Sequence, residues 1–407
     1  MKKFMIIVLD GFGVGQMDDV PKVRPQDTGA NTWLHILQAK PKLRLPTLEK
    51  LGLMNIIDWE TPQMKKNPNA TFGKAKLMHE GADTFFGHQE IVGTKPPKPF
   101  GEPIRNKIDR IYKVLTEHGY HVEFYHGKHE RMLVVENAVT VADNVECDPG
   151  QAFNVTAAID TISFDEVLKI GRLVRSVSQV PRVITFGGRG VTIQNILAAV
   201  EEHEGGYIGV NAPKSGVYNK DYHCVHMGYG VNPNVQVPTI LGKAGFPVYL
   251  LGKAADVIQN PYGTSISIVE TSQVLGKMIE VAEKMECGFI CCNVQETDLA
   301  GHQQSVDKYA RVLQTADPLI GRLIQKMNDE DILVVMADHG NDPTIGHPHH
   351  TRECVPLMIS GRKVRAGSIG VRQTLSDVGA TAAEYFGVSR PENGTSFLGE
   401  ILEKGAI

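Results

Sequence analysis

The stretch that decides the fold lies near the N-terminus and reads Phe4-Met5-Ile6-Ile7-Val8-Leu9-Asp10-Gly11-Phe12-Gly13. Its continuous apolar run has the length of a strand and the composition of one that is buried on both faces. Asp10 follows this strand directly. In open α/β sheets, ligands bind beyond the carboxyl ends of the strands, so Asp10 is a candidate metal ligand. A turn or helix-capping aspartate is the simpler alternative. The glycines do not form a clean dinucleotide-binding loop.

Further along the chain, strand-length apolar runs alternate with helical patterns. The strands are expected at Val248–Leu251, Phe289–Val294, Ile332–Met336 and Val355–Ile359. Ser305–Met327 has apolar residues at helical spacing, and Pro318 is expected to kink or divide that helix. A second helix, Thr374–Phe386, should end at Gly387. This alternation predicts an α/β fold with a mostly parallel sheet flanked by helices.

The middle of the chain has a different sequence pattern, with mixed strands and helices and many Gly and Pro residues. The proline-rich segment 95–99 opens it as a stiff, hinge-like connection. We therefore expect a discontinuous core formed by residues 1–98 and 223–407. Residues 99–222 should form an inserted α+β cap domain.

Composition and charge exclude several classes of protein. The chain has 407 residues, of which 42% are apolar, and its net charge is −4, which argues against a strongly basic nucleic-acid binder. The apolar runs are too short to span a membrane, and Asp10 interrupts the first one too early for a signal peptide. The six cysteines include no C-x-x-C pair. Together these features predict a cytoplasmic protein without a disulfide framework.

Aspartate and histidine residues recur where the predicted strands end. Asp298 and His302 follow one strand at i, i+4 spacing, which places them on one face if the segment is helical. Asp338-His339 follows another strand, and His350 lies further on. A lone histidine is more often structural than a ligand. Carboxylates and imidazoles gathered from several strand ends, however, suit two Mn²⁺ or Zn²⁺ ions, which together can clamp a phosphoryl group.

Thr84 is the candidate nucleophile. The segment Gly81–Ile91 reads as the start of a helix, with Thr84 placed where backbone amides favour a phosphate. Metal coordination would lower the pKa of the threonine hydroxyl and so activate it. A threonine that only caps the helix is the alternative.

These motifs, in this order, resemble the phosphopentomutase family of the alkaline phosphatase superfamily. The resemblance covers most of the chain and is weakest from about residue 100 to 230. Its motifs are DGFG at 10–13, DTGANTWLHI at 27–36, GADTFFGHQEIVG at 81–93, LGKAADV at 251–257, ADHGNDPT at 337–344, HTRECVP at 350–356 and GATAAEYFG with GTSF between 379 and 397.

The resemblance implies an alkaline-phosphatase-like core, two divalent metals, with Mn²⁺ preferred over Zn²⁺, and a phosphothreonine intermediate on Thr84. One metal would be held by Asp10, Thr84, Asp338 and His339, and the other by Asp298, His302 and His350. Lys253 and Arg352 would contact phosphate or stabilise nearby charge. A salt bridge is the alternative role for Arg352, and His349 is the rival to His350 as a ligand.

This chain also departs from the family pattern. Asp298 and His302 are one residue closer together than in phosphopentomutases, with the spacing of cofactor-independent phosphoglycerate mutases. Gln89 stands where the family has Trp. The inserted region lacks an evident arginine-rich sugar-phosphate motif, and its nearest candidates are Arg182 and Arg189.

The implied reaction interconverts ribose or deoxyribose 1-phosphate and 5-phosphate by phosphoryl relay through Thr84, with a cap that excludes water. One alternative is a metal-dependent phosphatase or phosphodiesterase on the same core. The other is a non-catalytic metal-binding protein. The expected partner is a small sugar phosphate, with no nucleic acid and no membrane. The sequence predicts neither the sugar nor the oligomeric state.

Overall fold

The computed structural model describes residues 2–98, 100–146 and 149–402. They form two compact units, one made of the chain up to Pro96 and from Asn232 onward, the other of Pro97–Val231. The second boundary lies beyond the expected position at 222/223. The physical reason is the strand β10 (His223–Gly228), which pairs antiparallel with β7 (Arg182–Gly188) and so completes the sheet of the inserted unit.

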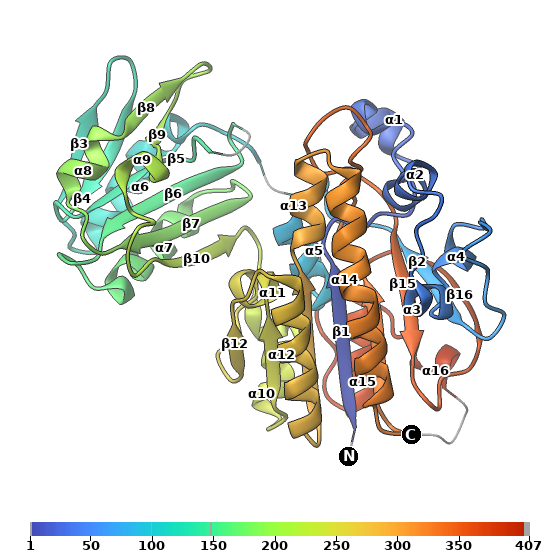
Figure 1. Cartoon of the computed structure of the whole chain (residues 1–407). Coiled ribbons are helices and arrows are strands. Elements are labelled where there is room, and N and C mark those ends of the chain that lie inside the picture. The colour runs from blue at the N-terminus through green and yellow to red at the C-terminus, as the bar shows by residue number, and fades with distance from the viewer. Residues whose placement is uncertain (1, 99, 147–148, 403–407) are drawn as a thin grey trace. The chain divides into compact units, whose positions relative to one another are not determined.

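The first unit, here called the core unit, is built on an eight-stranded sheet in the order β12-β11-β13-β1-β14-β15-β2-β16 (Figure 1). The strand β15 runs antiparallel to both of its neighbours, and the other pairings are parallel. The strand bounds are β1 Lys3–Leu9, β2 Thr71–Ala75, β11 Val248–Leu251, β12 Thr264–Ile266, β13 Gly288–Val294, β14 Ile332–Met336, β15 Val355–Ser360 and β16 Gly367–Arg372.

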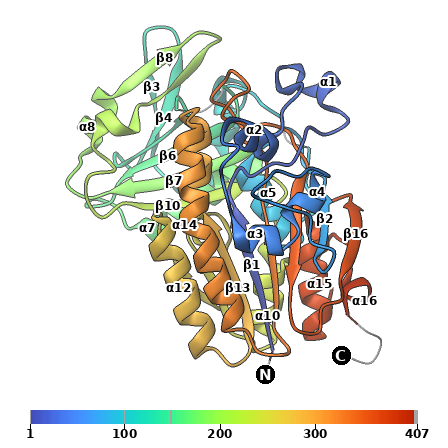
Figure 2. The same ribbon diagram turned by 45° about the vertical axis from the view of Figure 1, so that its right-hand side comes forward.

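Helices cover both faces of this sheet. Two long helices, α12 and α14, lie side by side on one face (Figure 1), and α5, α10 and α15 lie on the other (Figure 2). The helix bounds are α1 Val20–Val23, α2 Thr32–Ala39, α3 Pro46–Lys50, α4 Leu53–Ile56, α5 Thr84–Ile91, α10 Val237–Lys243, α11 Lys253–Val257, α12 Thr271–Lys284, α13 Glu296–His302, α14 Val306–Gln325, α15 Ser376–Phe386 and α16 Leu398–Ile401. Short 3-10 turns lie at Pro25–Asp27 and Pro233–Val235.

Burial explains why the central strands are apolar throughout. All seven residues of β1 are buried, as are all residues of β13 and β14 on either side of it. A strand covered by helices on both faces has no solvent face on which polar residues would alternate. The structure therefore confirms the α/β class with a mostly parallel sheet. Pro318 does not divide its helix, because α14 runs continuously through that position.

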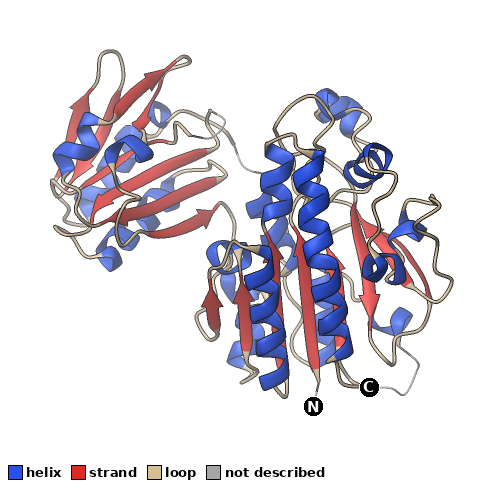
Figure 3. Ribbon diagram, in the orientation of Figure 1, coloured by secondary structure: helices blue, strands red, loops and turns tan. Residues whose placement is uncertain are grey.

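The inserted unit has its own sheet and its own core. Its six strands lie in the order β10-β7-β6-β5-β4-β3, and a two-stranded sheet pairs β8 with β9 (Figure 3). The remaining bounds are β3 Val122–His126, β4 Arg131–Val135, β5 Val139–Asp143, β6 Ala152–Ala158, β8 Val200–His203, β9 Tyr207–Val210, a 3-10 turn Ile104–Asn106, α6 Ile108–Glu117, α7 Phe164–Val177, α8 Ile193–Ala198 and α9 Ala212–Ser215.

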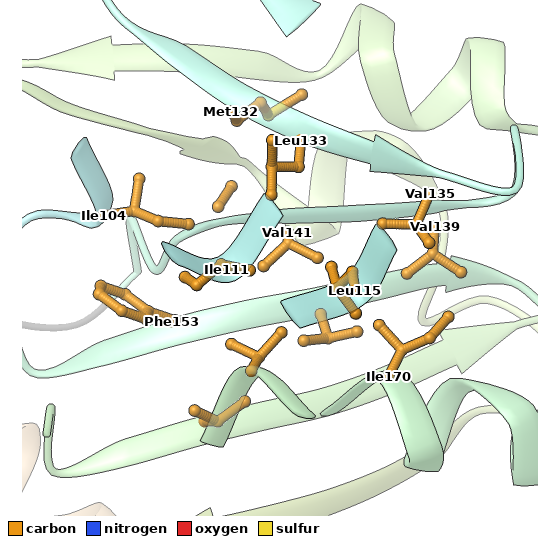
Figure 4. Close-up of a cluster of buried hydrophobic side chains, with 14 of the residues drawn as sticks. Ile104, Ile111, Leu115, Met132, Leu133, Val135, Val139, Val141, Phe153 and Ile170 are labelled. Atoms are coloured by element: carbon orange, nitrogen blue, oxygen red, sulfur yellow. The ribbon is translucent and has the colours of Figure 1, made fainter. Parts of the chain in front are cut away.

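The helices α6 and α7 cover one face of the six-stranded sheet. Ile111 and Leu115 of α6 and Ile170 of α7 pack in one apolar cluster with Val141 and Phe153 of the sheet (Figure 4). This cluster gives the inserted unit a hydrophobic core of its own. Among the residues described in either unit, no helix combines the length and the apolar character that crossing a bilayer requires.

Candidate active site

Three neighbouring strands deliver the candidate metal ligands to one edge of the core sheet. Asp10 follows β1, Asp298 and His302 lie on α13 after β13, and Asp338 and His339 follow β14. The strand β1 lies between β13 and β14 and runs parallel to both. The carboxyl ends of all three strands therefore meet, and the side chains that follow them come together.

The first group of candidate ligands consists of Asp10, Asp338 and His339, whose ligand atoms all lie within 4.8 Å of one another. All three side chains are completely buried. His339 Nε2 is 3.4 Å from Asp10 Oδ1 and 3.4 Å from Asp338 Oδ2. Neither His339 Nε2 nor Asp10 Oδ1 has a hydrogen-bond partner among the described residues. Because buried polar atoms are rarely left unpaired, this group fits a bound cation.

The second group consists of Asp298, His339 and His350, again within 4.8 Å, so the two groups share His339. His302 Nε2 lies 3.3 Å from Asp298 Oδ2 and 3.0 Å from His350 Nε2. Each of these two imidazoles donates its Nδ1 proton to a backbone carbonyl, that of Pro348 for His302 and that of Ala82 for His350. Two Nε2 atoms that face each other beside a carboxylate also fit a cation.

His350 therefore joins the cluster, whereas its rival His349 is exposed and lies beside His347. The i, i+4 spacing of Asp298 and His302 is realised on α13, with both side chains directed toward the same point.

Thr84 is the first residue of α5, and Asp83 caps this helix by accepting a hydrogen bond from Phe86 N at 2.9 Å. The hydroxyl of Thr84 donates to Asp338 Oδ2 at 2.7 Å. The candidate nucleophile thus touches a carboxylate of the first group. Its place at a helix N-terminus favours an incoming anion.

Lys253 places a positive charge among the carboxylates. Its Nζ lies 2.6 Å from Asp10 Oδ2, 3.2 Å from Asp298 Oδ2 and 3.5 Å from Thr84 Oγ1. Burial disfavours the charged amine, but the carboxylates of Asp10, Asp298 and Asp338 outweigh burial and raise the pKa of Lys253. The lysine therefore remains protonated, next to the hydroxyl.

Two residues that the sequence analysis did not single out hold the carboxylates in place. Asn293 Nδ2 donates to Asp10 Oδ2 at 3.0 Å and lies 3.0 Å from His88 Nε2. His88 Nδ1 lies 2.8 Å from the Thr84 carbonyl oxygen and 3.2 Å from Asp338 Oδ2. This chain of contacts fixes the orientation of two candidate ligands. The sequence did offer one indication of this role, because Asn293 is the single polar side chain in the otherwise apolar strand β13.

Arg352 does not join the cluster. Its guanidinium pairs with Asp19, with Nη2 2.9 Å from Oδ2, and donates to the carbonyl oxygens of Leu77, His79 and Gly81. The salt bridge considered for Arg352 is present, and its contact with phosphate stays a prediction. In the inserted unit, Arg189 is exposed and paired with Asp160 and Asp221.

The ionisation of the first group makes metal binding depend on pH. Burial opposes a charge on His339, but Asp338 and Asp10 outweigh it and raise the pKa of His339 to about 10. Burial likewise opposes ionisation of Asp338, yet His339 and His88 hold the pKa of that carboxyl well below its usual range. In the metal-free protein near neutral pH, the imidazole is therefore protonated and the carboxylate is not.

We therefore expect the binding of a divalent metal to release a proton from His339, because a metal binds the neutral imidazole. The apparent affinity should rise roughly tenfold per pH unit between about pH 6 and 9 for one proton released. Calorimetric titrations in buffers of different ionisation enthalpy measure this proton count. An affinity that does not change with pH over this range would contradict the expectation.

The chain is similar to known proteins over nearly its whole length. The family model described as the metalloenzyme superfamily matches residues 2–390. The phosphopentomutase of Caldanaerobacter subterraneus subsp. tengcongensis is 30% identical, with 100% of each chain covered. That of Herpetosiphon aurantiacus is also 30% identical, over 98% of this chain and 99% of its own.

Among solved structures, a Leishmania mexicana phosphoglycerate mutase is 11% identical over 97% of this chain and 96% of its own, with a TM-score of 0.45. The PH0037 protein of Pyrococcus horikoshii is 14% identical over 96% of this chain and 98% of its own, with the same TM-score. The full-length match to curated relatives and the matching superfamily model establish the family. This chain is an enzyme of the phosphopentomutase family, within the metalloenzyme superfamily.

Proposed function

We propose that this enzyme interconverts ribose or deoxyribose 1-phosphate and the corresponding 5-phosphate through a phosphorylated Thr84. The observation that carries the proposal is the contact between Thr84 Oγ1 and Asp338 Oδ2 at 2.7 Å, because Asp338 belongs to one of two candidate metal-binding groups that share His339. A hydroxyl without such surroundings is a weak nucleophile, because its pKa is far above neutral.

We assign Asp10, Thr84, Asp338 and His339 to one divalent metal and Asp298, His302 and His350 to the other, with Mn²⁺ preferred over Zn²⁺. The orphaned Asp10 Oδ1 and His339 Nε2 and the mixed oxygen and nitrogen donors fit this assignment. When bound, such ions lower the pKa of a coordinated hydroxyl and neutralise charge on a phosphoryl group.

The side chains of the chain itself position the reacting groups. Asp338 accepts the hydrogen bond of the Thr84 hydroxyl and so fixes the direction of its oxygen. The N-terminal end of α5 favours the negative charge of a phosphate at Thr84. Lys253, whose Nζ is 3.5 Å from Thr84 Oγ1, supplies a cation to the phosphate oxygens.

In the proposed relay, phosphorylated Thr84 transfers its phosphoryl group to the free 5-hydroxyl of ribose 1-phosphate and regains its own hydroxyl. The sugar then carries phosphate at both ends. Attack of the Thr84 oxygen on the 1-phosphate breaks the bond between that phosphorus and the sugar oxygen. Ribose 5-phosphate leaves and the phosphothreonine is restored, so that no phosphate is lost to water.

The test is a product analysis. The Mn²⁺-loaded enzyme is incubated with ribose 1-phosphate and a trace of ribose 1,5-bisphosphate, and the products are followed by ³¹P NMR. We expect ribose 5-phosphate without a matching rise in free phosphate. Free phosphate as the main product would replace this proposal with a metal-dependent phosphatase.

A further inference from the structure

The segment that leads into the nucleophile has no regular structure of its own. Residues 77–83, here called the approach loop, connect β2 to Thr84 at the start of α5. Leu77, His79 and Ala82 of this loop are buried. Buried backbone N–H and C=O groups require partners, and an irregular loop cannot supply them from its own ladder. The partners therefore have to come from side chains elsewhere.

Glu90, on α5, accepts hydrogen bonds from N–H groups of the approach loop. Its carboxylate accepts from Met78 N at 3.0 Å and from His79 N at 3.1 Å, and it lies 2.7 Å from His79 Nδ1. The same carboxylate accepts from Thr374 Oγ1 at 2.6 Å and from Leu375 N at 2.8 Å. Glu90 is completely buried, so these bonds hold it in one position.

Arg352 takes the C=O groups of the same loop. Its Nη1 donates to the carbonyl oxygens of His79 and Gly81, both at 2.7 Å, and its Nη2 donates to that of Leu77 at 3.3 Å. Asp19 balances the charge of the guanidinium. A planar group with five donors can make these bonds at once, which an ammonium group cannot do.

The approach loop also links the candidate nucleophile, Thr84, to the candidate metal ligand His350. Its last residues lead directly to Thr84, whose hydroxyl bonds to Asp338. The carbonyl of Ala82 accepts the Nδ1 proton of His350 at 2.8 Å, so the position of the loop also sets the ring of a candidate metal ligand. A shift of the approach loop would therefore displace both the nucleophile and His350.

We infer that Glu90 and Arg352 are positioning residues. Glu90 binds the N–H groups of the approach loop and Arg352 binds its C=O groups, and together they place Thr84 for phosphoryl transfer. The inference rests on the proposed function of Thr84. It also gives Arg352 a task other than direct contact with phosphate. The competing role is purely structural, in which both residues stabilise the fold without affecting the nucleophile.

A matched pair of variants separates the two roles. Arg352→Lys keeps the charge but loses the planar fork. Arg372→Lys is the control, because Arg372 is also largely buried, pairs with Asp377 and Glu400, and makes no side-chain hydrogen bond to the approach loop among the described residues. Both proteins are compared with wild type by unfolding midpoint, by kcat and KM, and by hydrogen exchange of the approach loop.

We expect Arg352→Lys to lower kcat on the order of 10²-fold, with KM nearly unchanged, because a misplaced nucleophile affects the reacting geometry rather than ground-state binding. Met78 and His79 amides should exchange faster than in wild type. The control should keep wild-type kcat and loop exchange. Equal losses of kcat in both variants, or unchanged loop exchange in Arg352→Lys, would overturn the inference.

Glu90→Gln is the second variant, used in the same way if Arg352→Lys does not fold. Its amide would bring an N–H group against the loop amides that Glu90 now accepts. The same loss of kcat and faster loop exchange are expected, and wild-type values of both would overturn the inference. Peptide mass spectrometry reports separately on the proposed function. If wild-type Thr84 carries no phosphate, the proposed function fails. The hydrogen-exchange data still decide whether Glu90 and Arg352 hold the approach loop in position.

Discussion

Thr84→Ala is expected to abolish mutase activity and any phosphatase activity together, lowering kcat by a factor on the order of 10⁴ or more. Both reactions would pass through the same phosphothreonine, so losing the hydroxyl removes their common step. The fold should survive, because Asp83, which caps α5, is unchanged. Turnover with ribose 1-phosphate and peptide mass spectrometry after a mild acid quench measure the two consequences.

Thr84→Ser is the control for this experiment. It keeps the hydroxyl but loses the methyl group that restricts the χ1 rotamer, so part of the activity and part of the phosphorylation should remain. Phosphate found on another residue would contradict the relay. So would near wild-type turnover by Thr84→Ala, and a water molecule attacking the substrate directly would then be the better mechanism.

Asp338→Asn is expected to lower kcat by a factor on the order of 10³ or more and to reduce the bound metal from two ions to one. Asp338 serves both the proposed metal and the Thr84 hydroxyl, which donates to its Oδ2 at 2.7 Å. Asparagine fills nearly the same volume at the end of β14, so the fold should persist. Metal analysis of the purified protein and its circular dichroism spectrum test these two points.

A variant of Asp338 that unfolds globally would show that the residue is mainly structural. Asp331→Asn offers a comparison, because Asp331 is also a buried aspartate beside β14, paired with Lys3 at 3.1 Å, but at the opposite end of the strand. It should weaken the fold without changing the number of bound metals.

The sequence predicted the central strands well, because residues buried on both faces leave an unbroken apolar signal. Val248–Leu251 and Ile332–Met336 begin and end in the structure at the expected residues. Weaker strands were not predicted. The strand β2 has one large apolar residue, Phe72, among Thr71, Gly73, Lys74 and Ala75, and β16 is an edge strand that is mostly exposed, so neither carries a continuous apolar pattern.

The candidate site likewise contains residues that the sequence could place and residues that it could not. Residues that directly follow apolar strands, such as Asp10 and Asp338, could be placed from the sequence because the strand positions them. The surroundings could not be placed. Arg352 lies two residues from His350 in the sequence. Its guanidinium nevertheless binds the approach loop and Asp19, which are both more than 250 residues away along the chain. Such contacts depend on tertiary packing, on which local patterns carry no information.

The position of β1 in the middle of the core sheet has a consequence for biosynthesis. This strand is made long before its two neighbours, because Lys3 pairs with Gly288 and Phe4 with Ile332. At roughly 5–20 residues per second, the strand waits for up to about a minute with both edges open. The inserted unit, whose residues are continuous, can complete its sheet during that delay. The candidate metal ligands, in contrast, extend from Asp10 to His350, so they can come together only after the core sheet has all of its central strands.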